Sequence, residues 1–266
     1  EQLADLAWLG LTWDEGPLEG GPAGPYRQSA RYPLYAEALE ALNRLGLLYP
    51  CWCSRREVRA AARAPHASDE GPVYAGTCKP AQPTAWADLA DLPRQRGRVP
   101  ALRLDVARAM ARLGVDRLAF DDCAAGPQRV DLRASMGDFV VRRRDGLAAY
   151  QVACSVDDAY MGCDLVVRGA DLLASAARQL LILRSLGLPE PRYAHVGLVL
   201  APDGTRLAKR DGAIALATFR ERGADPSALR ARLAQTAGLP ATGDLTALAA
   251  AFSLGGLTAA PVGLPE

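Results

Sequence analysis

The stretch from residue 165 to residue 200 constrains the fold most, because it reads as a strand, a helix and a second strand. Residues 165–168 (LVVR) form the kind of apolar run that a strand covered on both faces shows. Asp171 stands where an N-cap is expected, and residues 172–186 carry apolar side chains at helical spacing. Residues 196–200 (VGLVL) give the second strand. The pattern predicts an α/β fold with parallel strands.

Two basic features follow the two predicted strands. Arg168 ends the first strand, and a turn at residues 202–204 leads from the second into a basic loop, residues 205–213 (TRLAKRDGA). Ligands of βαβ units bind beyond the carboxyl ends of the strands, so both features should lie at one rim. Among 31 basic residues, only Lys79 and Lys209 are lysines. A lysine is a compact charge suited to a phosphate that moves during reaction, although a solvated basic loop is the simpler interpretation.

The cysteines suggest a metal site. Cys51 and Cys53 form a C-x-C pair, and Cys78 follows after a short excursion, which is plausible zinc spacing. Three ordinary thiols are the alternative. A closed site needs a fourth ligand, and from the residues alone His66 is the natural candidate. Six cysteines in 266 residues favour metal binding plus free thiols in a reducing compartment. The buried free thiols expected are Cys123, Cys154 and Cys163.

The remaining pattern predicts short elements around this unit. Helices are expected over residues 3–9, 29–44 (with Ser29 as N-cap), 84–92, 226–237 and 244–252, and short strands over 101–106 and 117–121. A hairpin with a D-G turn is predicted from 138–142 and 147–154, which places Tyr150 on its second strand. The run Arg142-Arg143-Arg144 is a solvated turn by default, or a contact for RNA phosphate.

Composition bounds the remaining possibilities. Half of the residues are hydrophobic, so the chain can bury a substantial core, and the net charge is +1. That charge gives no global nucleic-acid signal, and RNA binding would need a local basic face. The sequence shows no apolar run that could span a membrane and no signal-peptide pattern. We expect a cytoplasmic monomer without a membrane partner.

Several motifs together resemble one enzyme family. Residues 206–213 (RLAKRDGA) look like the KMSKS-type loop of class I aminoacyl-tRNA synthetases, in the form that glutamyl enzymes use. Residues 149–153 (AYQVA), 156–158 (VDD) and 166–173 (VVRGADLL) follow the glutamyl pattern in order and spacing. Arg206 and Ala208 depart from the usual Lys and Ser of that loop. Because ordinary glutamyl enzymes continue into a much longer helical region after this loop, we expect a short paralogue of the family.

The resemblance implies an architecture. It is the α/β, Rossmann-like catalytic domain of a class I synthetase, with its N-terminal half truncated, a zinc-knuckle insertion and a short helical C-terminal segment. The implied parts are the rest of the first half of the nucleotide-binding fold (1–50), the zinc-binding insertion (51–135), the second half with the KMSKS-like loop (136–213) and the C-terminal segment (214–266). The first strand and the HIGH-like ATP motif belong before residue 13 and are not in the sequence. We therefore expect the chain as given to be inactive by itself.

The resemblance also implies residue roles. Lys209 would be catalytic. The implied ATP contacts are Lys209, Arg206, Leu207, Ala208 and Arg210. Tyr150 and Arg168 would bind glutamate, although a core Tyr150, or Arg168 paired with Asp171 or Asp158, is the structural alternative. Zinc would be bound by Cys51, Cys53, Tyr74 and Cys78, with His66 as the other candidate for the fourth ligand.

The reaction implied for short paralogues is activation of L-glutamate by ATP, with Mg²⁺, and transfer to queuosine in the anticodon loop of tRNA(Asp). The anticodon stem-loop would then be the RNA partner. Two other interpretations stay open: a fragment of an ordinary glutamyl-tRNA synthetase that charges tRNA(Glu), and a zinc-bearing RNA-binding protein without catalysis.

Overall fold

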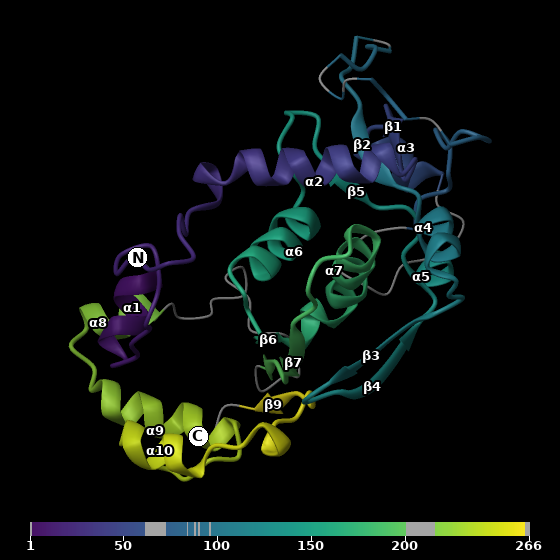
Figure 1. Ribbon diagram of the computed structural model, residues 1–266. Helices are drawn as coiled ribbons and strands as arrows, with labels where there is room; N and C mark the ends of the chain where they lie inside the picture. Colours follow the sequence, from purple (N-terminus) through teal and green to yellow (C-terminus); the bar gives the residue numbers. More distant parts are fainter. Residues whose placement is uncertain are drawn as a thin grey trace.

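The computed structural model describes residues 2–61, 73–83, 85–87, 89, 91–95, 97–200 and 216–263 (Figure 1). The predicted ATP loop with Lys209, and His66, lie outside the described residues. The α-helices are α1 (Gln2–Trp8), α2 (Tyr32–Arg44), α3 (Arg55–Ala60), α4 (Val106–Leu113), α5 (Leu132–Ser135), α6 (Tyr150–Tyr160), α7 (Leu173–Leu186), α8 (Leu216–Glu221), α9 (Pro226–Thr236) and α10 (Leu245–Ala251). The strands are β1 (Leu48–Cys51), β2 (Ala101–Leu104), β3 (Leu118–Asp122), β4 (Gly126–Val130), β5 (Val140–Arg142), β6 (Leu165–Gly169), β7 (Arg192–Val196), β8 (Val199–Leu200) and β9 (Val262–Gly263).

The predicted βαβ unit is present as β6, α7 and β7. Strands β6 and β7 pair in parallel, and the four-stranded sheet has the order β4-β3-β7-β6. Strand β3 is parallel to β7 and antiparallel to β4. The carboxyl ends of β3, β7 and β6 therefore meet at one edge of this sheet, where ligands of α/β folds bind.

A second sheet lies on the other side of the central helices. Strands β1, β2 and β5 form it in that order, all antiparallel. Strand β1 is fully buried and ends at Cys51, so this sheet carries the first cysteine of the C-x-C pair. Helices α6 and α7 lie between α2 and the four-stranded sheet (Figure 1).

The apolar core is built on these helices because their hydrophobic residues recur at helical spacing. Val152 and Val156 of α6 are fully buried, as are Leu180 and Leu181 of α7. They belong to one cluster with the inner face of α2 and with β2. Burying such a side chain contributes about 1.5–3 kcal/mol each, so packing against α7 decides the conformation of residues 150–160.

That packing explains one wrong prediction. The hairpin is reduced to a bridge between Arg142 and Ala148, with hydrogen bonds from the Arg143 N–H to the Leu147 carbonyl and from the Ala149 N–H to the Val141 carbonyl. Tyr150 begins helix α6 instead of lying on a strand.

The second strand of the βαβ unit is also displaced from its predicted place at 196–200. Strand β7 ends at Val196, and β8 pairs with the C-terminal β9. Gly197 marks the break, because its N–H donates to the Thr258 carbonyl and a Cβ there would lie 1.8 Å from the Ala260 oxygen. The C-terminal segment thus takes the backbone groups that would have extended β7.

Smaller corrections concern helix starts and one helix. Asp171 is no N-cap, since residues 170–172 form a 3₁₀ turn and α7 is capped by Leu172. Ser29 lies in another 3₁₀ turn, and α2 follows Arg31. The described residues of the stretch 84–92 form no helix. Cys163 is exposed and Cys123 and Cys154 are half-buried, whereas three buried thiols were expected. No described helix is long and apolar enough to cross a membrane.

Candidate active site and cysteine cluster

Arg168 lies at the sheet edge that the βαβ pattern predicts. It is the penultimate residue of β6 and stands in register with His195 of β7. Its Nε–H donates to His195 Nε2 at 3.0 Å, and Nη2 donates to Gln179 Oε1 at 2.8 Å. Nη2 also lies 3.5 Å from the carbonyl of Leu172, at the start of α7. Within the described part of the chain, Nε and Nη2 of the guanidinium are thus held by protein acceptors.

Tyr150 lies in the same electrostatic neighbourhood. As the first residue of α6 it is half exposed, and burial raises the pKa of its hydroxyl above the usual value while the Arg168 guanidinium acts to lower it. The structure therefore brings Tyr150 and Arg168 together, although they come from a helix and a strand. Tyr150 is therefore no buried core residue, whereas Arg168 is half-buried.

Two further titratable groups of α6 face Arg168. Burial raises the pKa of Asp158 to about 6, an effect that the positive charge of Arg168 opposes and the negative charge of Asp157 increases. Burial also raises the pKa of the Cys154 thiol to about 11.

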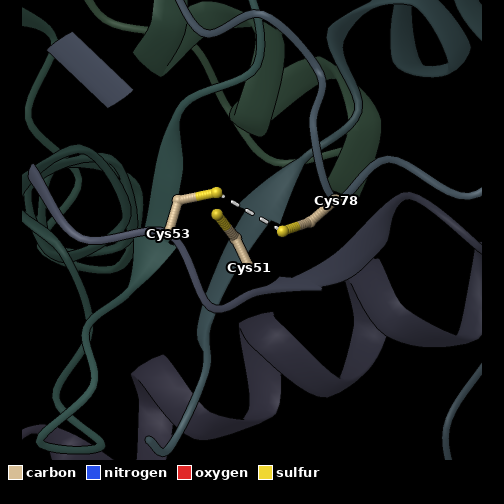
Figure 2. A group of neighbouring side chains, drawn as sticks. All are labelled: Cys51, Cys53 and Cys78. Carbon is tan, nitrogen blue, oxygen red and sulfur yellow. Dashed lines mark hydrogen bonds between the residues drawn. The ribbon is translucent and has the colours of Figure 1, made fainter. Parts of the chain in front are cut away.

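The three predicted cysteine ligands converge (Figure 2). The Sγ atoms of Cys51, Cys53 and Cys78 all lie within 4.8 Å of one another, and those of Cys53 and Cys78 are 3.5 Å apart. Cys51 ends β1, and Cys53 follows it just before α3. A capping box between Ser54 and Glu57 starts α3 and fixes where the C-x-C loop ends.

Tyr74 completes the group. Its Oη lies 3.4 Å from Cys51 Sγ and 3.7 Å from Cys53 Sγ. In a tetrahedral zinc site with bonds of about 2.3 Å to sulfur and 2.0 Å to oxygen, ligand atoms lie about 3.5–3.8 Å apart. The Cys53–Cys78 distance and the two distances from Tyr74 Oη are compatible with such an ion.

The pKa values of the side chains in the cluster shift in different directions. Burial raises the pKa of Tyr74, and burial raises the pKa of Cys53 to about 11. Burial alone would raise the pKa of Cys78, but hydrogen bonds with Tyr74 and with the Trp52 backbone have the larger effect, so the pKa is lowered. Without a cation beside them, Tyr74 and Cys53 stay protonated, so the set suits an ion that displaces protons as it binds.

Charged side chains hold the loops of the cluster in place. Arg144 donates from Nη2 to the carbonyls of Trp52 and Cys53, each at 2.7 Å. The Lys79 ammonium lies 2.6 Å from Asp105 and 3.0 Å from Asp138. Arg144 is therefore more than a solvated turn residue, and Lys79, one of the two lysines, anchors the chain beside Cys78.

A groove of about 980 Å³ runs between the cysteine cluster and Tyr150. Its lining includes Cys53 at one end and Tyr150 and Gln151 at the other. Six arginines line it against two aspartates: Arg55, Arg59, Arg103, Arg143, Arg144 and Arg178, with Asp138 and Asp145. The groove is thus a local basic face in a chain whose net charge is near zero.

Comparison with known proteins decides the family. The model of the tRNA synthetases class I (E and Q) catalytic domain matches residues 1–248. The chain belongs to this family. The resemblance drawn from its motifs is confirmed, and with it the prediction of a ligase of the class I synthetase type.

Relatives within this family are of two kinds. A glutamyl-Q tRNA(Asp) synthetase of Symbiobacterium thermophilum is 49% identical over 241 residues, which cover 90% of this chain and 71% of that protein. A glutamate–tRNA ligase 2 of Alkalilimnicola ehrlichii is 42% identical, covering 97% of this chain and 53% of the ligase. The crystal structure of glutamate–tRNA synthetase from Elizabethkingia anophelis has the same fold, with a TM-score of 0.75 at 23% identity, over all of this chain and 57% of that one.

Sequence reasoning missed the residues that hold Arg168. Asp122 ends β3 and His195 lies in β7, and neither was a candidate for the synthetase site. A signal was available, since the chain contains only two histidines and His195 directly precedes a predicted strand. What could not be read locally is that β3 pairs with β7, which brings Asp122 beside a residue 73 positions later.

Proposed function

We propose that this chain is the main part of the catalytic domain of an enzyme that activates L-glutamate with ATP and transfers it to queuosine in tRNA(Asp). The name of the 49% identical relative supports this acceptor. The observation that carries glutamate binding is Arg168, held at the carboxyl edge of the parallel strands beside Tyr150. The chain spans about seven-tenths of that relative and about half of the glutamate–tRNA ligase, so the activity is proposed for the whole protein.

The chemistry needs no protein nucleophile. An oxygen of the glutamate α-carboxylate attacks the α-phosphorus of ATP, the bond to pyrophosphate breaks, and glutamyl-adenylate forms. A hydroxyl of queuosine then attacks the activated carbonyl carbon, and AMP leaves. Positioning and neutralisation of charge carry such reactions. In this proposal Arg168 pairs with the side-chain carboxylate of glutamate through Nη1, and the Tyr150 hydroxyl donates a hydrogen bond to the substrate.

The ATP contacts belong to the KMSKS-like loop. Lys209 would stabilise the negative charge on the departing pyrophosphate, assisted by Arg206, Leu207, Ala208 and Arg210, with Mg²⁺ bound to the nucleotide. The motif carries this part of the proposal. Replacement of Lys209 by Ala should lower ATP–pyrophosphate exchange by roughly a hundredfold, the scale for removing one preorganised charge partner. Exchange within a few-fold of wild type would refute the role of Lys209.

The replacement Arg168→Ala should instead weaken the use of glutamate by about 2–5 kcal/mol, while the use of ATP stays unchanged.

For the cysteine cluster, the proposed ligand set is Cys51, Cys53, Tyr74 and Cys78 around one structural zinc. The ligand spacing supports it. The ion would join strand β1 to the loop of residues 74–78. Metal analysis should find about one zinc per chain, lost in Cys78→Ser. If Tyr74→Phe keeps the metal and His66→Ala loses it, the fourth ligand is His66 instead.

The arginine-lined groove is the proposed path for the RNA loop. Its cationic lining would contact phosphates, while Tyr150 marks the end at which the activated glutamate lies. Arg55 and Arg59 of α3 line one side of it, so Arg55→Ala with Arg59→Ala should weaken tRNA binding and reduce its salt dependence. Arg112→Ala, on α4 outside this groove, is the matched control.

The acceptor itself needs a direct test. The full-length enzyme is given labelled glutamate with tRNA(Asp) bearing queuosine, or with tRNA(Glu). We expect label on tRNA(Asp), and removal of its 3′-terminal adenosine should leave that label intact because the acceptor lies in the anticodon loop. Label on tRNA(Glu) alone, at the 3′ end, would make this an ordinary glutamyl-tRNA synthetase, as the 42% identical relative is named.

A further inference from the structure

A buried hydrogen-bonded chain runs across the ends of three strands behind Arg168. Asp122 Oδ2, at the end of β3, lies 2.5 Å from His195 Nδ1 on β7, and His195 Nε2 lies 3.0 Å from Arg168 Nε on β6. The side chains of Asp122 and His195 are completely buried. Buried polar side chains are normally hydrogen-bonded. Because these two lie at the edge of the sheet where ligands bind, we expect them to serve that site.

The donors in this chain fix its proton positions. An arginine Nε–H can only donate, so His195 Nε2 must carry a lone pair, and Nδ1 must then carry the proton that Asp122 accepts. Asp122 cannot turn away, because its other oxygen accepts from the backbone N–H groups of Ala124, Ala125 and His195. Burial lowers the pKa of His195, which keeps the imidazole neutral.

A neutral acceptor has a specific advantage here. A carboxylate placed directly on Arg168 would fix its orientation but would also neutralise the charge that a substrate carboxylate needs. The imidazole fixes Nε without a charge of its own, and the face of the Tyr193 ring, 5.1 Å from the guanidinium carbon, adds an uncharged contact. Tyr193 also stacks on His195, with ring centroids 5.8 Å apart. His195 and Tyr193 thus hold Arg168 through contacts that carry no negative charge.

We propose that Asp122 and His195 are positioning residues that aim Arg168 at the side-chain carboxylate of glutamate. This rests on the proposed function, because it assumes that Arg168 binds that carboxylate. Asp122 fixes the tautomer of His195, and His195 in turn fixes the rotation of the guanidinium. Neither side chain touches the substrate.

The replacement Asp122→Asn tests the relay. The three backbone donors keep an oxygen at the Oδ1 position, so the new amide nitrogen must face His195 Nδ1. Two donors cannot face each other, and the imidazole must move its proton to Nε2, against the Nε–H of Arg168. We expect the KM for glutamate in ATP–pyrophosphate exchange to rise about 10- to 100-fold, with the KM for ATP within about twofold.

The matched control is Asp121→Asn, the exposed neighbour on β3, which should change neither constant. Equal rises for glutamate and ATP, or a lower melting temperature with an unchanged KM for glutamate, would show that the pair only supports the fold and would overturn the proposal. If exchange in the wild-type enzyme does not depend on glutamate, the proposed function itself is wrong.

Nitrogen-15 spectroscopy tests the predicted tautomer of His195 in the wild-type protein, in which Asp122 and His195 are both present. In nitrogen-15 spectra of the histidine-labelled full-length enzyme, the imidazole signals of His195 are the ones that disappear in His195→Gln. We expect a protonated Nδ1 and an unprotonated Nε2 at neutral pH. The opposite tautomer, or an imidazolium, would overturn the proposal, because neither can accept the hydrogen bond from Arg168.

Discussion

At the scale of single residues, burial changes the pKa of an acidic side chain beside Arg168. Asp158 is the clearest case, since burial raises its pKa from 3.8 to about 6. Its ionisation costs the folded state more than the unfolded state. The resulting penalty is absent below pH 4, grows as the pH rises from about 4 to about 6, and is complete above that.

Asp158→Asn removes this penalty. We predict that it raises the free energy of unfolding at pH 7.5 by about 1–2 kcal/mol, a value reduced from the full shift because the group is partly exposed to solvent. At pH 4 the gain should vanish, since Asp158 is then protonated in both states. Chemical denaturation of both proteins at the two pH values measures this. An equal gain at both would assign the effect to something other than ionisation.

At the scale of elements, the turn between β5 and α6 supports the C-x-C loop. Arg144 binds the carbonyls of Trp52 and Cys53 across a separation of more than 90 residues. Its neighbour Arg143 is exposed and pairs only with Asp145 in the described part of the chain. The two arginines are adjacent in sequence, but one holds a distant loop and the other does not.

This contrast gives a prediction about the metal. Arg144→Ala frees the loop that carries two proposed ligands, so zinc affinity should fall about 10- to 100-fold, the usual effect of losing a group that orients ligands. Arg143→Ala should leave it unchanged. Competition with a chelating dye measures both. Equal affinities for the two variants would mean that the cysteines are held by their own strand and helix.

At the scale of the whole molecule, a buried ion pair joins the start of the chain to its centre. Arg31, just before α2, donates from Nε to Asp157 of α6 at 2.6 Å, and the Tyr35 hydroxyl donates to the same carboxylate at 2.8 Å. Gln28 adds a third hydrogen bond at 2.9 Å. This cluster fixes α2 on α6, next to the helix face that carries Tyr150.

Asp157→Ala leaves Arg31 buried without its partner, and should destabilise the protein by about 3–5 kcal/mol. Asp164→Ala is the control: its partner Arg192 is 3.8 Å away, and both side chains are exposed, so the loss should be below about 1 kcal/mol. Denaturant titration of the two variants compares them. Similar small losses would show that apolar packing alone joins α2 to α6.

The sequence by itself determined strand β6 and helix α7, the place of Arg168 near a strand end and the three cysteines of the cluster. It also determined the family, through motifs whose order and spacing survive without any knowledge of contacts. These signals are local, because an apolar run, a 3.6-residue period or a C-x-C pair is complete within a few residues.

Only the tertiary structure decided whether Tyr150 lies on a strand or a helix, and which groups hold Arg168. Residues 147–154 have a pattern that suits the second strand of a hairpin, but burial against α7 makes the helix over 150–160 more stable. Asp122, His195 and Arg168 come from strands far apart in sequence, and they meet because β7 pairs with both β3 and β6. Such meetings depend on the order of strands in the sheet, which is set by the packing of the whole chain and by no local stretch of it.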